Sequence, residues 1–245
     1  MTCGDDDQFG SLRLWLRDGV DVYISPDDVV HFVFLSTRKR LRLKVTPLLI
    51  ECLEWLDGSA SVMELDARYK AQASWLDSKH PSSFVDFIQF LYGKGVLVRK
   101  NWMHNAFCPE QVERYSRQLN FFLDIEESEA AATALLKRIM NCRIALIGIG
   151  AVGSWILREL VQIGFQRFIL VDPKTLKPAD RTRNAIFDHL LIGEPKALVA
   201  ERFVHSQALE PETRAIQSPL DIETNVEELT GPDTDLVINT ADEPY

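Results

Sequence analysis

The stretch RIALIGIGAVGSWILRELVQIGFQRFILVD, residues 143–172, decides the fold. IALIG is a continuous apolar run typical of a fully buried strand, and FILVD predicts a second strand of the same kind. Between them, Gly148, Gly150 and Gly153 form a GxGxxG turn into a helix. Without Cβ atoms the backbone can come close to a ligand, to which the helix N-terminus offers N–H groups and a positive dipole. Asp172 follows at about the 20-residue spacing at which an acid accepts hydrogen bonds from ribose hydroxyls, so we expect a nucleotide site.

The glycine turn by itself leaves both NAD and ATP open as the ligand. A dehydrogenase needs a base and room for nicotinamide, whereas adenylyl transfer needs cations and a metal-holding acid around a triphosphate. Cations follow the second strand, so the flanking residues favour ATP. A nicotinamide-dependent oxidoreductase is the less favoured alternative.

Length and composition are typical of a folded protein with two domains. The 245 residues exceed one average domain, and 46% of them are apolar and 26% charged. The net charge of −9 disfavours nucleic acid as a partner. The four cysteines are far apart and form no CxxC pair, which argues against a zinc site. The longest uncharged stretch is too short to span a membrane, and the acidic N-terminus does not resemble a secretion signal, so we expect a cytoplasmic protein.

Two segments of different character flank a short linker. In residues 11–100, the runs DVYIS, VVHFVFLS and RLRLKV predict short antiparallel strands. Apolar residues at helical spacing then predict three helices, which begin at Pro47, at the serine cap of SVMELDARY and after the PSS tripeptide. The strand VLVRK ends the segment. This order predicts a winged-helix domain, a linker at 101–110 and a second domain at 111–245. The expected fold class is therefore α/β, with a Rossmann-like, mainly parallel sheet in the second domain.

The first domain resembles the peptide-recognition element of enzymes that modify ribosomally made peptides, a PqqD-like winged helix. Residues 48–65, with the LDGS tetrapeptide between two helices, carry most of the likeness. The resemblance implies that a leader peptide adds a strand to the third predicted strand and lies against the third helix. The implied peptide-binding residues are Arg40, Leu41, Arg42, Leu43, Lys44 and Val45 on the strand, and Phe84 and Ile88 on the helix. A DNA-binding winged helix is the alternative.

Motifs along the second domain occur in the order typical of the ThiF/MoeB/HesA superfamily of ubiquitin-activating-type adenylyltransferases. They are RYSRQ at 114–118, GIGAVG at 148–153, LVD at 170–172, RTRNAIF at 181–187, GEPK at 193–196 and NTADEP at 239–244. Together with the N-terminal module, the RYSRQ and ADEP motifs are most similar to those of the MccB-type enzymes, which adenylylate microcin C, and their relatives.

The resemblance implies a site for ATP and Mg²⁺ in which particular residues have particular roles. These are Asp172 for the ribose; Gly148, Gly150 and Gly153 beside the nucleotide; Arg183 and Lys196 for the phosphates; Asp242 for magnesium; and Arg117, which would enter the partner subunit's site in a homodimer. A carboxylate that attacks the α-phosphate approaches an anion. Cations and Mg²⁺ would therefore stabilise the charge that grows in the transition state.

This chain departs from the family's pattern in two positions and in its length. The family usually has Asn where this chain has Asp180, and Gln where it has Asn184, so one phosphate donor has become an acid. Both residues are still expected beside the nucleotide. The chain also ends at Tyr245, after the fourth predicted strand, whereas the family's domain continues with more sheet. We therefore expect a truncated domain.

These patterns lead to two hypotheses of different classes. The first is an enzyme that uses ATP to adenylylate the C-terminal carboxylate of a peptide or small protein during biosynthesis of a modified ribosomal peptide. The alternative is a non-catalytic scaffold that binds a leader peptide and delivers the precursor to a modifying enzyme, and Asp180 is its best support. In both, a precursor or leader peptide is the expected partner.

Overall fold

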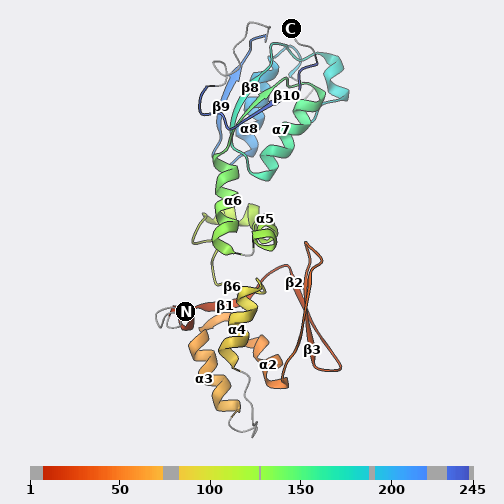
Figure 1. The fold of residues 1–245 in the computed structure, drawn as a ribbon. Coiled ribbons are helices and arrows are strands. Elements are labelled where there is room, and N and C mark those ends of the chain that lie inside the picture. The colour runs from red at the N-terminus through yellow and green to blue at the C-terminus, as the bar shows by residue number, and fades with distance from the viewer. Residues whose placement is uncertain (1–7, 74–82, 127, 188–190, 220–230, 243–245) are drawn as a thin grey trace. The chain divides into compact units, whose positions relative to one another are not determined.

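The computed structural model describes residues 8–73, 83–126, 128–187, 191–219 and 231–242 (Figure 1). The chain divides into two compact units, Met1–Ala134 and Leu135–Tyr245, and each has its own sheet structure and hydrophobic core. The expected mixed α/β architecture is confirmed. Glu243 and Pro244 of the NTADEP motif, and Pro81 and Ser82 before the third predicted helix, lie outside the described residues.

The first unit contains two antiparallel sheets. One has the order β2-β3-β4 and consists of β2 (Val20–Ser25), β3 (Val29–Phe34) and β4 (Arg40–Lys44), the three strands that alternation and β-branched residues predict. The other has the order β5-β1-β6 and consists of β5 (Asp57–Ser61), β1 (Arg13–Leu16) and β6 (Leu97–Arg99). The sequence patterns did not predict β1 and β5. Both are short, and DGSAS in β5 lacks the bulky residues that mark a strand.

Three helices of the first unit pack their apolar faces into one core. They are α2 (Pro47–Glu51), which continues as the 3₁₀ turn η1 (Cys52–Trp55), α3 (Val62–Ala73) and α4 (Phe84–Gly93). The predicted capping box before α3 is present, because Ser61 N donates to Glu64 Oε2 at 2.6 Å and Glu64 N donates to Ser61 Oγ at 3.3 Å. The winged-helix assignment of this part of the chain stays a prediction.

Two long helices follow β6, namely α5 (Pro109–Glu126) and α6 (Glu129–Asn141). The predicted linker does not coincide with the division between the units, because α5 belongs to the first unit. Arg17, after β1, forms an ion pair with Asp124 of α5, and both side chains are only 2% exposed. Arg99 of β6 forms a second ion pair, with Glu129 at the start of α6. These two ion pairs attach the end of α5 and the start of α6 to the sheet that contains β1 and β6.

The second unit is built on a four-stranded parallel sheet with the order β10-β7-β8-β9. Its strands are β7 (Arg143–Ile147), β8 (Arg167–Val171), β9 (Glu212–Ile216) and β10 (Leu236–Asn239), and its helices are α7 (Ala151–Ile163) and α8 (Lys196–Gln207), with the 3₁₀ turn η2 (Pro178–Thr182) before α8. The prediction of a parallel sheet around the glycine turn is confirmed. β8 and β10 both follow β7 in the chain but pair on opposite sides of it, so the strand order changes direction at β7. Open α/β sheets bind ligands at the carboxyl ends of the strands at such a point.

The turn from β7 to α7 is too tightly packed for side chains. Gly148 has φ +82°, and a Cβ there would lie 2.7 Å from Ala241 N. A Cβ at Gly153 would lie 2.0 Å from the Gly148 carbonyl oxygen and 2.7 Å from Thr240 Oγ1. Gly150, in contrast, has open space on its Cβ side, with nothing within 4 Å. The first and third glycines therefore allow close packing, and the second leaves the backbone accessible.

In the parts of the chain that the structure describes, no helix is both long enough and apolar enough to cross a membrane. Among the described helices, α5 is the longest. It contains the RYSRQ motif and has two acidic residues in its last turn. Its buried side is formed by Val112, Tyr115, Leu119, Phe122 and Leu123. The helix is therefore amphipathic, with one face buried and the other exposed.

We predict that Gly153→Ala lowers the free energy of unfolding by about 1–3 kcal/mol or more, since the new methyl group would overlap a backbone oxygen. Gly150→Ala, the matched control in the same turn, should lower it much less, because its methyl group meets no atom. Urea denaturation of both variants measures the difference. Equal losses of stability would contradict the packing role of Gly153.

Candidate functional site

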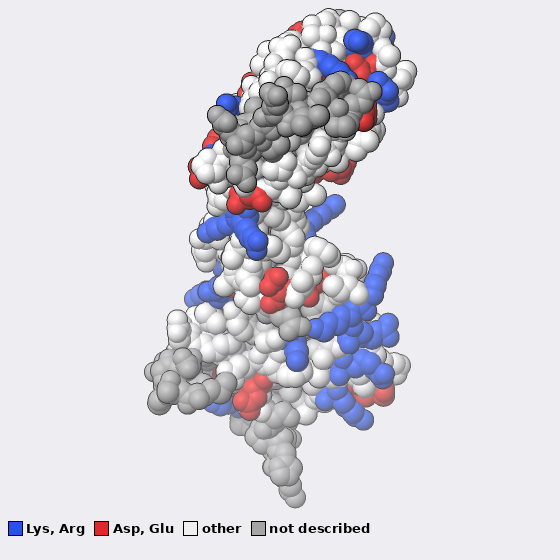
Figure 2. All heavy atoms as spheres, turned by 45° about the horizontal axis from the view of Figure 1, so that its top comes forward, with Lys and Arg blue, Asp and Glu red and all other residues white. Residues whose placement is uncertain are grey.

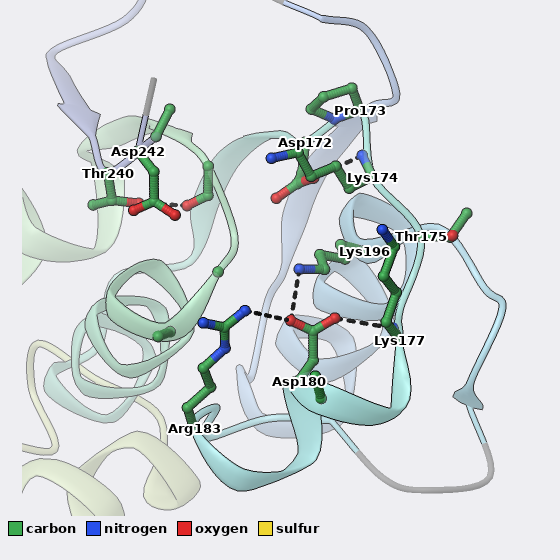
Figure 3. A pocket seen from close by; sticks show the side chains of 15 residues that line it. Asp172, Pro173, Lys174, Thr175, Lys177, Asp180, Arg183, Lys196, Thr240 and Asp242 are labelled. Carbon is green, nitrogen blue, oxygen red and sulfur yellow. Dashed lines mark hydrogen bonds and ion pairs between the residues drawn. The ribbon is translucent and has the colours of Figure 1, made fainter. Parts of the chain in front are cut away.

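A cavity of about 310 Å³ lies at the carboxyl ends of the parallel strands in the second unit (Figure 3). It is lined by the glycine turn after β7, the segment that follows β8 through η2, the first residue of α8 and the residues after β10. Among the predicted site residues, those that line it are Gly148, Gly150, Asp172, Asp180, Arg183, Lys196 and Asp242. The tertiary structure thus brings together side chains from distant parts of the sequence.

The N-terminus of α7 opens one side of the cavity. Gly150 is the N-cap of this helix and provides no side-chain hydrogen bond to it. The N–H groups of a helix's first turn have no partner within the helix, and they carry partial positive charge. Since a ligand can approach Gly150 closely, this end of α7 suits an anion such as a phosphate.

Asp172 holds two backbone segments at the end of β8. Its side chain is almost fully buried, at 4% exposure, and it accepts hydrogen bonds from Ile149 N at 2.7 Å and from Lys174 N at 2.8 Å. These bonds connect the glycine turn to the loop after β8. A carboxylate has about four lone-pair positions, so Asp172 can also accept hydrogen bonds from the hydroxyls of a ligand in the cavity.

Asp180 is at the centre of the charged side chains that line the cavity. One carboxylate oxygen accepts a hydrogen bond from Lys177 N at 2.9 Å, and the other accepts one from Lys196 Nζ at 3.1 Å. Arg183 Nη2 lies 3.6 Å from that same second oxygen (Figure 3). Burial alone would raise the pKa of Asp180, but the hydrogen bonds from Lys177 N and Lys196, with the nearby positive charges, outweigh it and hold this pKa below its usual range.

The two cations beside Asp180 differ in freedom. The Lys196 side chain is 7% exposed, so it is fixed by its buried ion pair. The Arg183 side chain is 62% exposed, and its ion pair with Asp180 is long and weak. Arg183 can therefore turn toward a ligand at little cost, whereas Lys196 is held in one position.

The charges that line the cavity sum to a small excess of positive charge. Lys174, Lys177, Arg183 and Lys196 are opposed by Asp172, Asp180 and Asp242. Sequence reasoning missed Lys174, Lys177 and Thr240 as lining residues. The two lysines follow Asp172 in the same loop, a signal that could have been read, but the position of Thr240 depends on strand pairing. The surplus positive charge and the helix N-terminus together favour an anionic ligand.

Asp242 reaches the cavity because the segment before it is fixed against β7. Thr240 N donates to the Ile147 carbonyl oxygen at 2.8 Å, and Thr240 Oγ1 donates to the same oxygen at 3.2 Å. Asp242 itself is exposed and lies across the cavity from Asp180 and Lys196 (Figure 3). Among the described residues there is no cluster of three or more His, Cys, Asp or Glu side chains that could hold a metal.

Three predicted site residues are not among those that line the cavity. The Asn184 amide nitrogen donates to the Asp180 carbonyl oxygen at 2.7 Å, and its amide oxygen accepts from Ile186 N and Phe187 N. Its role in this structure is therefore to shape the loop, and Gly153 serves helix packing. Arg117 is an exposed residue of α5 in the first unit, so its role stays a prediction.

The predicted peptide-binding residues fall into two groups. On β4, Arg40, Arg42 and Lys44 are exposed, and Figure 2 shows Lys and Arg side chains gathered over the sheet of β2, β3 and β4. On α4, the prediction needs correction, because Phe84 and Ile88 are 1% and 0% exposed and belong to the core. The apolar stripe that suggested a binding face is the face that α4 buries.

Comparisons with known proteins place these features in a family. The model of the ThiF family matches residues 115–244. The chain is 28% identical over 134 residues to the sulfur carrier protein adenylyltransferase of Thermus thermophilus, covering 54% of this chain and 46% of that protein. It is 33% identical over 69 residues to the NEDD8-activating enzyme E1 catalytic subunit of Saccharomyces cerevisiae, covering 28% and 23%. The chain thus spans less than half the length of these two relatives.

Solved structures share the fold over most of the chain. The crystal structure of PaaA has a TM-score of 0.70 at 16% identity, covering 91% of this chain and 66% of that one. The crystal structure of Escherichia coli MccB with ATP has a TM-score of 0.62 at 18% identity, covering 95% and 62%. At these identities the likeness establishes the fold alone.

We predict that Lys196→Met and Asp180→Asn each destabilise the protein, by up to about 3–5 kcal/mol, because each leaves a buried partner unpaired. The double variant should lose less than the sum of the two, with a coupling energy of about 0.5–3 kcal/mol. Urea denaturation of the four proteins at pH 7 measures this coupling.

The coupling should also depend on pH with a defined sign. Because the pKa of Asp180 is lowered in the folded protein, the carboxylate stays charged and the coupling persists at neutral and mildly acidic pH. It should vanish only as the pH falls below about 3.9, the ordinary value of an aspartate. Additive single losses at pH 7 would show that the two side chains do not interact.

Proposed function

Since the chain belongs to the ThiF family, we propose that it uses ATP to adenylylate the C-terminal carboxylate of a peptide or small protein. The observation that carries the proposal is the joint placement of Asp172, Asp180, Arg183, Lys196 and Asp242 around one cavity at the glycine turn. All of these residues except Asp180 lie in motifs that resemble the family's pattern. The adenylyltransferase among the relatives supports the reaction class, and the peptide substrate is our own proposal.

The residues present fit ATP. We propose that Asp172 accepts hydrogen bonds from the ribose hydroxyls and that the backbone near Gly150 lies against the phosphates. The open space beside Gly150, the positive end of α7 and a cavity of about 310 Å³ support this assignment. Arg183 and Lys196 would face the negative charge of the triphosphate.

The proposed chemistry joins a carboxylate oxygen to the α-phosphorus and breaks the bond to the departing pyrophosphate. Negative charge grows on the phosphate oxygens during this step, and donors already in place stabilise it without having to reorganise. Lys196 is fixed by Asp180, so it supplies such a charge. Arg183 is exposed, so it can leave Asp180 and follow the charge onto the departing group.

Asp242 is the residue proposed to hold Mg²⁺. Magnesium in phosphate-binding sites is usually held by one or two carboxylates together with water and phosphate oxygens, and this fits a single acid beside the triphosphate. When bound, the ion would neutralise phosphate charge. Asp242 would orient it next to the glycine turn, because Thr240 and Ala241 pack against that turn.

The alternative function, a peptide-binding scaffold without catalysis, is favoured by one observation. Asp180 stands where the family usually has Asn, and its carboxylate already forms ion pairs with both proposed phosphate-binding cations. A triphosphate would have to compete with this acid for Arg183 and share Lys196 with it. In the scaffold hypothesis, Asp180 pairs permanently with the two cations, and no triphosphate binds to them.

We propose that the peptide binds along β4 by adding a strand to the sheet. In the order β2-β3-β4, the outer edge of β4 has no partner strand among the described residues, so its backbone groups can pair with an extended peptide. Arg40, Arg42 and Lys44 are exposed along it and favour an acidic segment. We also propose, from the resemblance alone, that Arg117 acts in the partner subunit's site of a homodimer.

We predict that Arg183→Ala lowers the rate of ATP–pyrophosphate exchange in the presence of the peptide by about 100- to 1000-fold, the usual effect of removing one transition-state donor. Arg181→Ala is the matched control, because Arg181 is an exposed arginine of the same motif that does not line the cavity. Its rate should change only a few-fold. Equal effects of the two variants would argue against a direct role of Arg183.

We predict that the double reversal Arg40→Glu and Arg42→Glu weakens binding of a candidate acidic precursor peptide by about 10-fold, and more at low salt than at high salt. Lys100→Glu, which reverses an exposed cation outside β4, should have little effect. Fluorescence anisotropy of the labelled peptide measures the affinity.

The same peptide separates the two functions. If the chain binds it but Mg-ATP neither binds nor supports pyrophosphate exchange, the scaffold hypothesis replaces the enzyme. Mass spectrometry of the peptide after incubation with ATP would detect the adenylylated product directly.

A further inference from the structure

A second cavity, of about 140 Å³, lies within the first unit and does not belong to the proposed ATP site. Its walls come from β1 and the residues that follow it, β6, the turn at 101–104 and the inner side of α5. Asp18 and His104 also line it and are exposed, so it opens to solvent on their side. An engineered cavity of about 150 Å³ can hold benzene, so this one has room for one small organic group.

The polar atoms around this cavity are unusually poorly satisfied. Arg17 is 2% exposed, and its Nε and Nη1 atoms are buried without a hydrogen-bond partner among the described residues. Within the same described ranges, the buried Trp15 Nε1 and Asn120 Oδ1 also have no partner. Buried polar groups nearly always find partners, and leaving one without costs about 1–3 kcal/mol. Three side chains in this state around one cavity point to a bound group that completes them.

The charge of the site argues for a neutral occupant. The guanidinium of Arg17 already forms an ion pair with Asp124 through Nη2, and both side chains are 2% exposed. Asp124 therefore balances the positive charge of Arg17, although the N–H groups on Nε and Nη1 have no hydrogen-bond partner among the described residues. Asp18 adds a negative charge to the wall, so a carboxylate or phosphate would be repelled. A cation would face the donors of Arg17 and Trp15, which is also unfavourable.

The cavity also has an apolar side, although Asn101 and Ser116 add polar groups to its lining. Val98 is 1% exposed, Trp102 is 4% exposed and Val112 is 8% exposed, and Met103 completes this side. The donors come from Arg17 and Trp15 at the β1 side, and the acceptor comes from Asn120 on α5. The cavity therefore combines a hydrophobic wall with donors for one acceptor atom and an acceptor for one donor.

We propose that this cavity is a binding site for a neutral amide carried on a small apolar group, the chemistry of one uncharged peptide residue. The amide oxygen would accept hydrogen bonds from Arg17 and Trp15, its N–H would donate to Asn120 Oδ1, and the apolar part would lie against Trp102 and Met103. This site is additional to the adenylylation proposed above and stands or falls independently of it.

Three small probes of the same shape but different charge test the proposal. Isobutyramide, isobutyrate and isobutylammonium are titrated into the ¹⁵N-labelled full chain, and the indole N–H signals of Trp15 and Trp102 are followed by NMR. Isobutyramide should shift both signals in a saturable manner. Isobutyrate and isobutylammonium should bind about 100-fold more weakly or not at all, because either would bury an uncompensated charge.

Two variants test the polar contacts without disturbing the Arg17–Asp124 ion pair. Trp15→Phe removes the indole donor but keeps an aromatic ring, and Asn120→Leu removes the acceptor. Each should weaken isobutyramide binding about 10-fold. Because Trp15→Phe removes one indole signal, binding to this variant is measured from the Trp102 signal. Trp55→Phe is the matched control, since Trp55 packs against Arg68 and does not line the cavity. Thermal unfolding verifies that each variant is folded, and Asn120→Leu alone suffices should Trp15→Phe not fold.

The contrary results are equally defined. If isobutyramide causes no saturable shift, the cavity holds only water and the proposal fails. It also fails if all three probes shift the signals equally, or if folded Asn120→Leu protein binds isobutyramide as tightly as the unaltered chain. ATP–pyrophosphate exchange by the same samples is read separately, so a failure here is distinguished from a failure of the proposed adenylylation.

Discussion

The contact between the turn after β7 and the segment after β10 is the constraint on which the site depends. Gly148 and Gly153 lie so close to Ala241 and Thr240 that no Cβ fits at either glycine. This contact holds Asp242, one residue further along, beside the helix N-terminus. Asp172 ties the end of β8 to the same turn through Ile149 N. A single tight turn thus positions both acids to which we assign the ribose and the metal.

Asp180 determines how the positive charges around that turn can act. A buried ion pair contributes little net stability, because desolvation opposes its Coulomb energy, but it fixes geometry strongly since breaking it is costly. Lys196 is fixed in this way, while Arg183 remains at the surface and can exchange one anion for another. The family usually has a neutral amide at this position. In this chain the position holds Asp180, whose charge is the main difference between the enzyme hypothesis and the scaffold hypothesis.

A buried ion pair connects α5 to the N-terminal part of the first unit. Arg17 and Asp124 are far apart in sequence, yet both are nearly fully buried, and they join β1 to α5. Neither residue could have been left inside without the other. Arg17 also lines a cavity, and its Nε and Nη1 atoms have no hydrogen-bond partner among the described residues. One interaction thus explains why α5 belongs with the N-terminal sheets and why a polar cavity lies between them.

The sequence by itself determined the elements and the residue types of the main site. The glycine turn between two apolar strands, the acid after the second strand and the capping box at Ser61 depend on short-range geometry that the chain carries locally. Only the tertiary structure decided which distant groups meet. It paired β1 with β5 and β6, buried Phe84 and Ile88, turned the Asn184 side chain to its own loop, and brought Lys174, Lys177 and Thr240 to the cavity. Periodicity shows that a residue has an apolar or polar side, but the partner that covers that side is set by packing between segments far apart in sequence.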